Sequence, residues 1–272
     1  MVKKLLIAST LSGLLIAGLA MADADTKTTK AEVKTATSTE TAKTDNIIDS
    51  LKTLLTETFN RTPDSLTESP VSGIYQVLYG TEVVYVSRDG KYFIAGDMIN
   101  MGTRENLSKL AKRSVRNDIM KTKLKDPIVF KAKDEKHVVK VFTDIDCPYC
   151  AKLHREVPAL NEKGITVEYL MFPRAGIGSK SYDKAVSVWC AGDSKAQQTA
   201  MTTAKERKPF DEKKCENPVK AQYELGQEVG VTGTPALVTS TGRLIPGYMT
   251  ADRLVKMLEA DSQSKKSAVK KN

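Results

Sequence analysis

Two cysteines separated by two residues are the part of this chain whose spacing is best suited to chemistry. The motif Cys-Pro-Tyr-Cys occupies positions 147 to 150, directly after an apolar, strand-like run at 139–146. Beyond it, apolar residues recur at helical spacing: Leu153, Val157 and Leu160. The pattern predicts a strand that delivers a dithiol to the N-terminus of a helix.

A helix N-terminus favours the reactive form of a cysteine. The thiolate is the nucleophile in disulfide exchange, and free backbone N–H groups and the helix dipole favour negative charge at that end. We therefore predict Cys147 as the nucleophile and Cys150, one turn further on, as the residue that resolves a mixed disulfide. Pro148 suits the first helical turn, where its missing N–H has no cost.

A zinc site is the alternative interpretation of the two cysteines. His154 lies one turn beyond Cys150 and could supply a third ligand, and His137 is the other histidine. A structural zinc site uses four ligands, however, and the remaining two cysteines are distant in the sequence. We favour a packing or helix-surface position for His154, and we expect no metal.

A threonine–proline pair far downstream provides the second clue. Thr234-Pro235 precedes an apolar, strand-like run at 236–238. Only about 5–6% of X-Pro bonds are cis, so frequency alone predicts a trans bond here. The order strand, Cys-x-x-Cys, helix and later Thr-Pro nevertheless resembles the thioredoxin fold, in which a cis-proline loop faces the dithiol. The resemblance implies that Thr234 and Pro235 join the cysteines, and that the Thr234 backbone pairs with an extended substrate.

Several segments of the C-terminal half resemble the DsbC family of periplasmic disulfide isomerases. They are residues 142–145, 164–167, 172–174, 189–191 and 244–248. The Pro-Tyr pair between the cysteines also resembles the sister protein DsbG. Membership would imply a thiol-disulfide isomerase with chaperone activity, no bound cofactor, a membrane reductant similar to DsbD, and substrate contacts at Pro148 and Tyr149.

The same resemblance implies a second, structural disulfide between Cys190 and Cys215. Four cysteines allow three connectivities, and the local dithiol favours this pairing of the other two. The alternative is a pair of free buried thiols. Trp189, the one tryptophan of the chain, lies beside Cys190, and we expect it to pack in the core.

The N-terminus predicts export. A basic start, an uncharged apolar stretch at 5–21 and small residues around Ala22 are typical of a cleavable signal peptide at 1–22, with a second possible cleavage site after Ala24. An uncleaved membrane anchor is the alternative, but this stretch is short and interrupted by polar residues. We expect a periplasmic protein.

The remaining chain is long enough for two modest domains. Residues 23–45 hold almost no large apolar side chain, which predicts a disordered leader. We expect a small N-terminal domain at 46–105, a linker helix at 106–128, a catalytic domain at 129–261 and a solvated basic tail at 262–272. Within the catalytic domain, residues 180–230 are expected to form helices inserted into the thioredoxin core.

The N-terminal domain is expected to be α+β and cystatin-like. A helix capped by Asp45 carries an apolar stripe, and strand-like runs follow at 73–79, 82–87 and 91–95, the last two joined by a hairpin. A unit this small is marginal as a monomer. By position and pattern it is similar to the dimerisation domain of the DsbC family, which implies a homodimer.

The basic character of the chain is local. The formal net charge is +9, and residues 104–125 hold eight basic and two acidic residues. Nucleic-acid binding would call for interleaved aromatic residues or a known binding module, and neither occurs in this run. We therefore expect a solvated helix face and no nucleic-acid partner.

The sequence thus predicts a dimeric periplasmic isomerase that rearranges incorrect disulfides in misfolded secreted proteins. Three alternatives remain open at this point. They are a DsbA-like oxidase, a DsbG-like reductase of oxidised cysteines, and a holdase chaperone in which the thiols are incidental.

Overall fold

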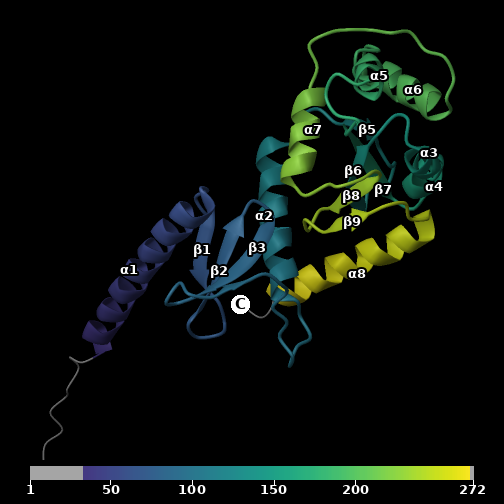
Figure 1. Ribbon diagram of the computed structural model, residues 1–272. Helices are drawn as coiled ribbons and strands as arrows, with labels where there is room; N and C mark the ends of the chain where they lie inside the picture. The colour runs from purple at the N-terminus through teal and green to yellow at the C-terminus, as the bar shows by residue number, and fades with distance from the viewer. Residues whose placement is uncertain (1–32, 270–272) are drawn as a thin grey trace, which may run out of the picture. The chain divides into compact units, whose positions relative to one another are not determined.

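The computed structural model describes residues 33–269 (Figure 1). The expected signal peptide and the leader as far as residue 32 lie outside the described residues. Contacts divide the chain into two units, Met1–Asn46 and Ile47–Asn272, and both sheets belong to the second. No helix among residues 33–269 is long and apolar enough to cross a membrane.

Two terminal segments are more helical than the sequence predicts. Helix α1 spans Val33–Phe59, so residues 33–45 are helical rather than disordered, and position 45 lies inside the helix instead of capping it. Helix α8 spans Ala251–Val269 and continues into the expected tail. Once a helix is nucleated, each added residue gains a hydrogen bond at small cost. A lack of apolar side chains therefore excludes burial but does not exclude a helix.

The N-terminal sheet has four antiparallel strands in the order β1-β2-β3-β4. Their bounds are Ser65–Glu68, Ile74–Tyr79, Glu82–Ser87 and Phe93–Ile94. Strands β2 to β4 match the three predicted runs, and the expected hairpin joins β3 to β4. Strand β1 was not predicted, because it is short and Leu66 is its one buried residue.

Helix α1 covers this sheet with only part of its apolar stripe. Leu51 and Leu55 are buried in a cluster with four residues of the strands: Leu66, Tyr75, Val77 and Val86. Leu54 and Phe59, which belong to the same predicted stripe, are 40% and 46% exposed. The Phe59 ring lies 5.1 Å from that of Phe93, another exposed residue. The N-terminal region therefore leaves a group of large apolar side chains uncovered.

The linker helix, α2, spans Leu107–Lys123. The Asn106 side chain caps it by accepting a hydrogen bond from the Lys109 backbone N–H. The Tyr85 and Ser108 hydroxyls lie 2.5 Å apart and join β3 to the first turn of α2. The helix ends before the predicted residue 128, and Ile128–Phe130 form an unpredicted short strand, β5.

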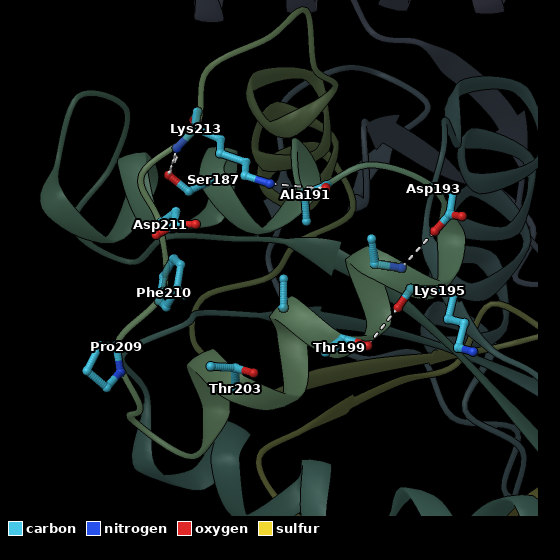
Figure 2. A pocket seen from close by; sticks show the side chains of 12 residues that line it. Ser187, Ala191, Asp193, Lys195, Thr199, Thr203, Pro209, Phe210, Asp211 and Lys213 are labelled. Carbon is cyan, nitrogen blue, oxygen red and sulfur yellow. Dashed lines mark hydrogen bonds between the residues drawn. The ribbon is translucent and has the colours of Figure 1, made fainter.

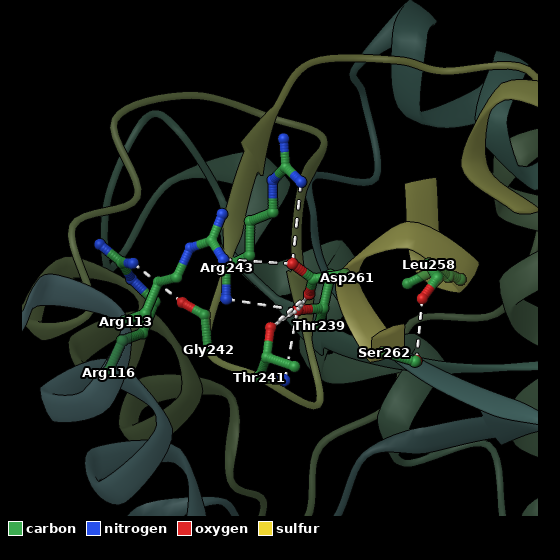
Figure 3. Close-up of polar contacts among 9 residues, drawn as sticks. All are labelled: Arg113, Arg116, Thr239, Thr241, Gly242, Arg243, Leu258, Asp261 and Ser262. Atoms are coloured by element: carbon green, nitrogen blue, oxygen red, sulfur yellow. Dashed lines mark hydrogen bonds and ion pairs between the residues drawn. The ribbon is translucent and has the colours of Figure 1, made fainter. Parts of the chain in front are cut away.

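Buried polar contacts fix α2 to the second sheet (Figure 3). The Arg116 guanidinium donates to the carbonyls of Val229 and Gly242, at 2.7 and 3.0 Å. Asp261 of α8 accepts from Arg113 at 3.2 Å and also from the hydroxyls of Thr239 and Thr241. A Cβ atom at Gly242 would lie 2.1 Å from the Arg113 carbonyl oxygen, so only glycine permits this approach.

The second sheet has five strands in the order β5-β7-β6-β8-β9 (Figure 1). Strand β6, His137–Thr143, lies at its centre and runs parallel to β7, Ile165–Met171. The antiparallel strands β8, Ala236–Thr239, and β9, Leu244–Pro246, complete it. Strands β6 and β8 correspond to the strand-like runs predicted before the dithiol and after Pro235.

Helices surround this sheet in the predicted order. The segment after the dithiol splits into α3, Pro148–Arg155, and α4, Val157–Glu162, because Pro158 lacks the N–H that would continue the hydrogen-bond ladder. The expected helical insertion between β7 and β8 consists of α5, Lys180–Trp189, α6, Ser194–Lys205, and α7, Val219–Glu228.

Candidate active site

Asp144 organises the loop that connects β6 to α3. Its carboxylate accepts hydrogen bonds from the backbone N–H groups of Asp146 and Arg174, both at 2.8 Å, and from the Ser181 hydroxyl at 2.7 Å. Burial raises the pKa of this carboxyl, but these hydrogen bonds outweigh it and hold the pKa below its usual range. Asp144 is therefore a fixed carboxylate that sets the path of the chain into the dithiol.

Cys147 occupies the N-cap position of α3, as predicted. Its backbone is extended, with φ −77° and ψ 121°, and its carbonyl accepts the first helical hydrogen bond from the Ala151 N–H at 3.0 Å. Its Sγ donates to the Thr234 carbonyl oxygen at 3.3 Å. The sulfur therefore lies at the positive end of a helix and within reach of a backbone carbonyl from a distant loop.

The Thr234–Pro235 peptide bond is cis, as the resemblance implied and contrary to the frequency argument. The Pro235 carbonyl accepts a hydrogen bond from the Gly247 N–H at 2.8 Å. The Thr234 hydroxyl is buried and makes no hydrogen bond to the described residues. The structure thus brings Thr234 and Pro235 to the dithiol, 87 residues away from Cys147 in the sequence.

The two thiols are free, and their environments differ. Burial raises the pKa of Cys147, but its interactions with Thr234, Cys150 and the Tyr149 backbone lower it more, so the pKa falls below its ordinary value. For Cys150, which is 0% exposed, burial dominates and the pKa is raised. One sulfur is therefore suited to attack as a thiolate, and the other is suited to remain protonated.

Comparison with known proteins identifies both halves of the chain. A model of the disulfide bond isomerase N-terminal domain matches residues 22–109, and a thioredoxin-like domain matches residues 125–261. The thiol:disulfide interchange protein DsbC of Haemophilus influenzae is 39% identical over 207 residues, which cover 76% of this chain and 88% of the relative. DsbC of Salmonella typhimurium is 43% identical, over 66% of this chain and 74% of the relative.

The chain belongs to the DsbC family.

Membership confirms the expected thioredoxin-like fold and shows that the protein is a thiol-disulfide oxidoreductase. DsbC of Escherichia coli is a further relative, 38% identical over 70% of this chain and 79% of its own length. A solved disulfide interchange protein from Neisseria gonorrhoeae shares 32% identity, with a TM-score of 0.44 over 49% of this chain and 94% of that one.

The second disulfide expected for a DsbC relative is formed. Cys190 and Cys215 are bonded, with a Cα–Cα distance of 5.8 Å, and they join the end of α5 to the segment before α7. Trp189 beside it is half-buried against the core, and its Nε1 donates to the Asp126 carbonyl at 3.3 Å.

His154 is a buried packing residue in this DsbC family member. Its Nδ1 lies 3.1 Å from the Tyr169 hydroxyl, and its Nε2 lies 3.0 Å from the Thr202 hydroxyl. Burial lowers its pKa to about 4, so the ring is neutral at ordinary pH. Both ring nitrogens are thus engaged away from the cysteines, and residues 33–269 contain no cluster of side chains that could hold a metal.

The residues between the two cysteines face solvent. Pro148 is exposed and Tyr149 is 63% exposed. A cavity of about 520 Å³ is lined by Asp146, Lys184 and Phe210, among others, but by neither cysteine. Figure 2 shows a second cavity, of about 590 Å³, on the helical insertion, where Phe210 and Thr203 face it and neither cysteine contributes.

Two residues near the dithiol were not predicted from the sequence. Asp144 lies in the segment 142–145 that resembles the DsbC family, but no role was predicted for it. Lys205 was not predicted to have any role. Lys205 ends α6 and is 4% exposed, with its Nζ 2.7 Å from both the Thr143 hydroxyl and the Asp144 carbonyl. It lies in a run rich in charged residues, so its type and spacing gave no sign of burial.

Proposed function

We propose that this protein is an isomerase that rearranges incorrect disulfides in secreted proteins through Cys147 and Cys150. The Cys147 thiolate attacks a substrate disulfide, which forms a mixed disulfide and releases one substrate thiolate. A second substrate thiol then completes the rearrangement, or Cys150 attacks and releases the substrate in reduced form. Membership of the DsbC family gives the reaction class, and the geometry of the dithiol supports these two roles.

The difference between the two thiols carries this proposal. Cys147 has a lowered pKa and a position at a helix N-terminus, whereas Cys150 is fully buried with a raised pKa. A protonated resolving thiol attacks slowly, which gives a bound substrate time to exchange its own sulfurs. The Thr234 carbonyl beside Cys147 would pair with the extended backbone of the substrate, with Pro235, Pro148 and Tyr149 as neighbouring contacts.

Refolding of scrambled ribonuclease tests the assignment. Cys147→Ser should abolish both mixed-disulfide formation and recovery of ribonuclease activity, because the attacking sulfur is absent. Cys150→Ser is the matched control: it should still form mixed disulfides and accumulate them. Recovery of ribonuclease activity at the unsubstituted rate with Cys147→Ser would exclude the assignment and would favour a holdase in which the thiols are incidental.

The pH dependence of Cys147 alkylation gives an independent check. In a Cys150→Ser variant, Cys147 should titrate below the free-cysteine value of about 8.5, because the thiolate accepts hydrogen bonds at the helix N-terminus. Iodoacetamide labelling rates measured from pH 4 to pH 10, with free cysteine as the control, give the inflection. An inflection at or above the value of free cysteine would contradict the proposed nucleophile.

We also propose a homodimer formed through the N-terminal region. The exposed apolar residues Leu54, Phe59, Phe93 and Ile94 and the short edge strand β4 are features that a second copy would cover. Two dithiols would then face one cleft, which suits capture of unfolded chains and a chaperone activity. Light scattering of the mature protein at micromolar concentration should give twice the chain mass, and a monomer would contradict the dimer.

A periplasmic location and a DsbD-like reductant complete the proposal. The predicted signal peptide would direct export, and the Cys190–Cys215 bond suits an oxidising compartment. An isomerase there needs an electron supply that keeps Cys147 and Cys150 reduced. Trapping of thiols in cells with a mass-shifting alkylator should find this pair reduced; a fully oxidised pair would favour a DsbA-like oxidase.

A further inference from the structure

Lys205 is a charged residue in a place that normally excludes charge. It is 4% exposed, and its Nζ donates to the Thr143 hydroxyl and the Asp144 carbonyl, both at 2.7 Å. Removing an ammonium group from water is costly unless it is hydrogen-bonded and its charge is compensated. Neither of these partners carries a charge, so the compensating charge has to come from other groups nearby.

The Thr143 hydroxyl connects this ammonium group to the resolving cysteine. Thr143 is the last residue of β6 and is 1% exposed, and its side chain acts to lower the pKa of Cys150. A hydroxyl has one hydrogen to donate, and an ammonium group can only donate. Because the Thr143 oxygen accepts from Lys205, its own hydrogen is free to point at the Cys150 sulfur. Lys205 Nζ thus donates to Thr143 Oγ1, which leaves the Thr143 hydroxyl hydrogen available to a Cys150 thiolate as acceptor.

We propose that Lys205 is a positioning residue for the resolving step: it orients the Thr143 hydroxyl toward Cys150 and places a positive charge that stabilises the Cys150 thiolate. The inference rests on the proposed roles of Cys147 and Cys150. It explains how a sulfur that no solvent reaches can still become a nucleophile.

The step balances without another reactant. Cys150 loses its proton, and its sulfur bonds to the Cys147 sulfur as the bond from Cys147 to the substrate sulfur breaks. The electron pair of that bond leaves with the substrate sulfur, which then takes up a proton. The two protein sulfurs end as a disulfide, and the substrate ends as a thiol.

Other groups near Lys205 determine how the step depends on pH. Lys205 interacts electrostatically with titratable groups of the dithiol loop and of α3, namely Asp144, Asp146, Cys147, Cys150 and His154. Of these, His154 is neutral at ordinary pH, and Asp144, whose pKa is lowered, is ionised throughout the range in which thiols titrate. The cysteines and Lys205 itself are therefore the groups that shape the rate of resolution above neutral pH.

Single-turnover reaction of the reduced protein with oxidised glutathione separates the two chemical steps. Acid quenching and intact mass measurement report the Cys147–glutathione mixed disulfide and its later loss. Lys205→Met should slow loss roughly tenfold or more at pH 7 and formation by a smaller factor, since hydrogen bonds to charged groups are the strong ones. The rate of mixed-disulfide loss increases with pH, and in Lys205→Met this increase should occur at a higher pH than in the unsubstituted protein.

Three matched variants make the test specific. Thr143→Val keeps the shape and Lys205 but removes the hydroxyl, so it should slow loss in the same way, whereas Thr143→Ser should restore it. Lys208→Met removes an exposed lysine three residues further on and should change neither step. If Lys205→Met does not fold, the two Thr143 variants still decide the matter.

The proposal is overturned if Lys205→Met or Thr143→Val loses the mixed disulfide at the same rate, and with the same pH profile, as the unsubstituted protein. That result would leave the proposed function intact as long as Cys147→Ser forms no mixed disulfide. Formation of mixed disulfide by Cys147→Ser would instead contradict the proposed function, so the two failures are distinguishable.

Discussion

The N-terminal region and the catalytic region differ in how completely each buries its apolar side chains. The core of the N-terminal sheet is one small cluster between α1 and the strands, whereas two larger clusters fill the two faces of the five-stranded sheet. Among the described residues, most exposed large apolar side chains lie between Leu54 and Leu110; in the catalytic region they are Tyr149 and Ile177. The catalytic region is thus complete by itself, and the N-terminal region calls for a partner.

Removal of the N-terminal region is the strongest way to break this comparison. Deleting residues 23–105 should leave a folded monomer that still reduces a small disulfide at the normal rate, because the site and its core are untouched. The KM for scrambled ribonuclease should rise about 100-fold, since capture by two linked sites exceeds capture by one. Light scattering and paired activity assays check this, and a dimeric fragment would contradict it.

Loss of the second disulfide should test the self-sufficiency of the catalytic region. Replacing both Cys190 and Cys215 with serine removes a bond between residues that are 25 positions apart in the sequence. The loop-entropy relation gives a loss of about 3 kcal/mol, or about 10 °C in melting temperature. Differential scanning calorimetry of the deletion fragment measures the loss, with the reduced, alkylated fragment as a comparison. An unchanged melting temperature would show that the helical insertion holds without this bond.

Acid sensitivity should give the smallest effect and should be confined to the catalytic region. The pKa of Asp144 is lowered in the folded state, so its contribution is present above the unfolded value of about 3.9 and is lost as pH falls through the folded value. Asp144→Asn should cost about 2 kcal/mol at pH 7 and should flatten the stability curve below pH 4.

Urea unfolding of the Asp144→Asn variant at several pH values, followed by Trp189 fluorescence, tests this prediction. Asp146→Asn is the matched control, because that carboxylate is half-exposed in its ion pair with Lys184. Equal acid sensitivity in the Asp144→Asn variant and the unsubstituted protein would contradict the account.

The sequence predicted those parts of the molecule that local patterns specify. The dithiol at a helix start and the long strands with regular burial were predicted because each follows from spacing over a few residues. The place of Thr234 and Pro235 needed the family resemblance, since a contact across 87 residues leaves no local sign. Lys205 was missed for the same reason: its burial depends on where α6 meets the end of β6, and nothing in its own run of charges specifies that meeting.

The linker helix was predicted too long, and its basic face was wrongly predicted to be solvated. The helix α2 was predicted, but the sequence could not show that the side chains of Arg113 and Arg116 would form buried contacts. Both belong to a basic run that was interpreted as a solvated face, and Arg116 is 7% exposed. Short edge strands such as β1 and β5 were missed because three or four residues carry too little alternation to distinguish a strand from a loop.

The contacts of Arg116 set the minimum length of an autonomous catalytic fragment. A fragment starting at residue 129 would leave the carbonyls of Val229 and Gly242 without their guanidinium donor and would uncover the surface beneath α2. One starting at residue 106 would keep them paired. Limited proteolysis should therefore nick the chain before Asn106 and spare the helix that follows, so that α2 belongs to the cooperative unit of the catalytic region and is more than a tether between two domains.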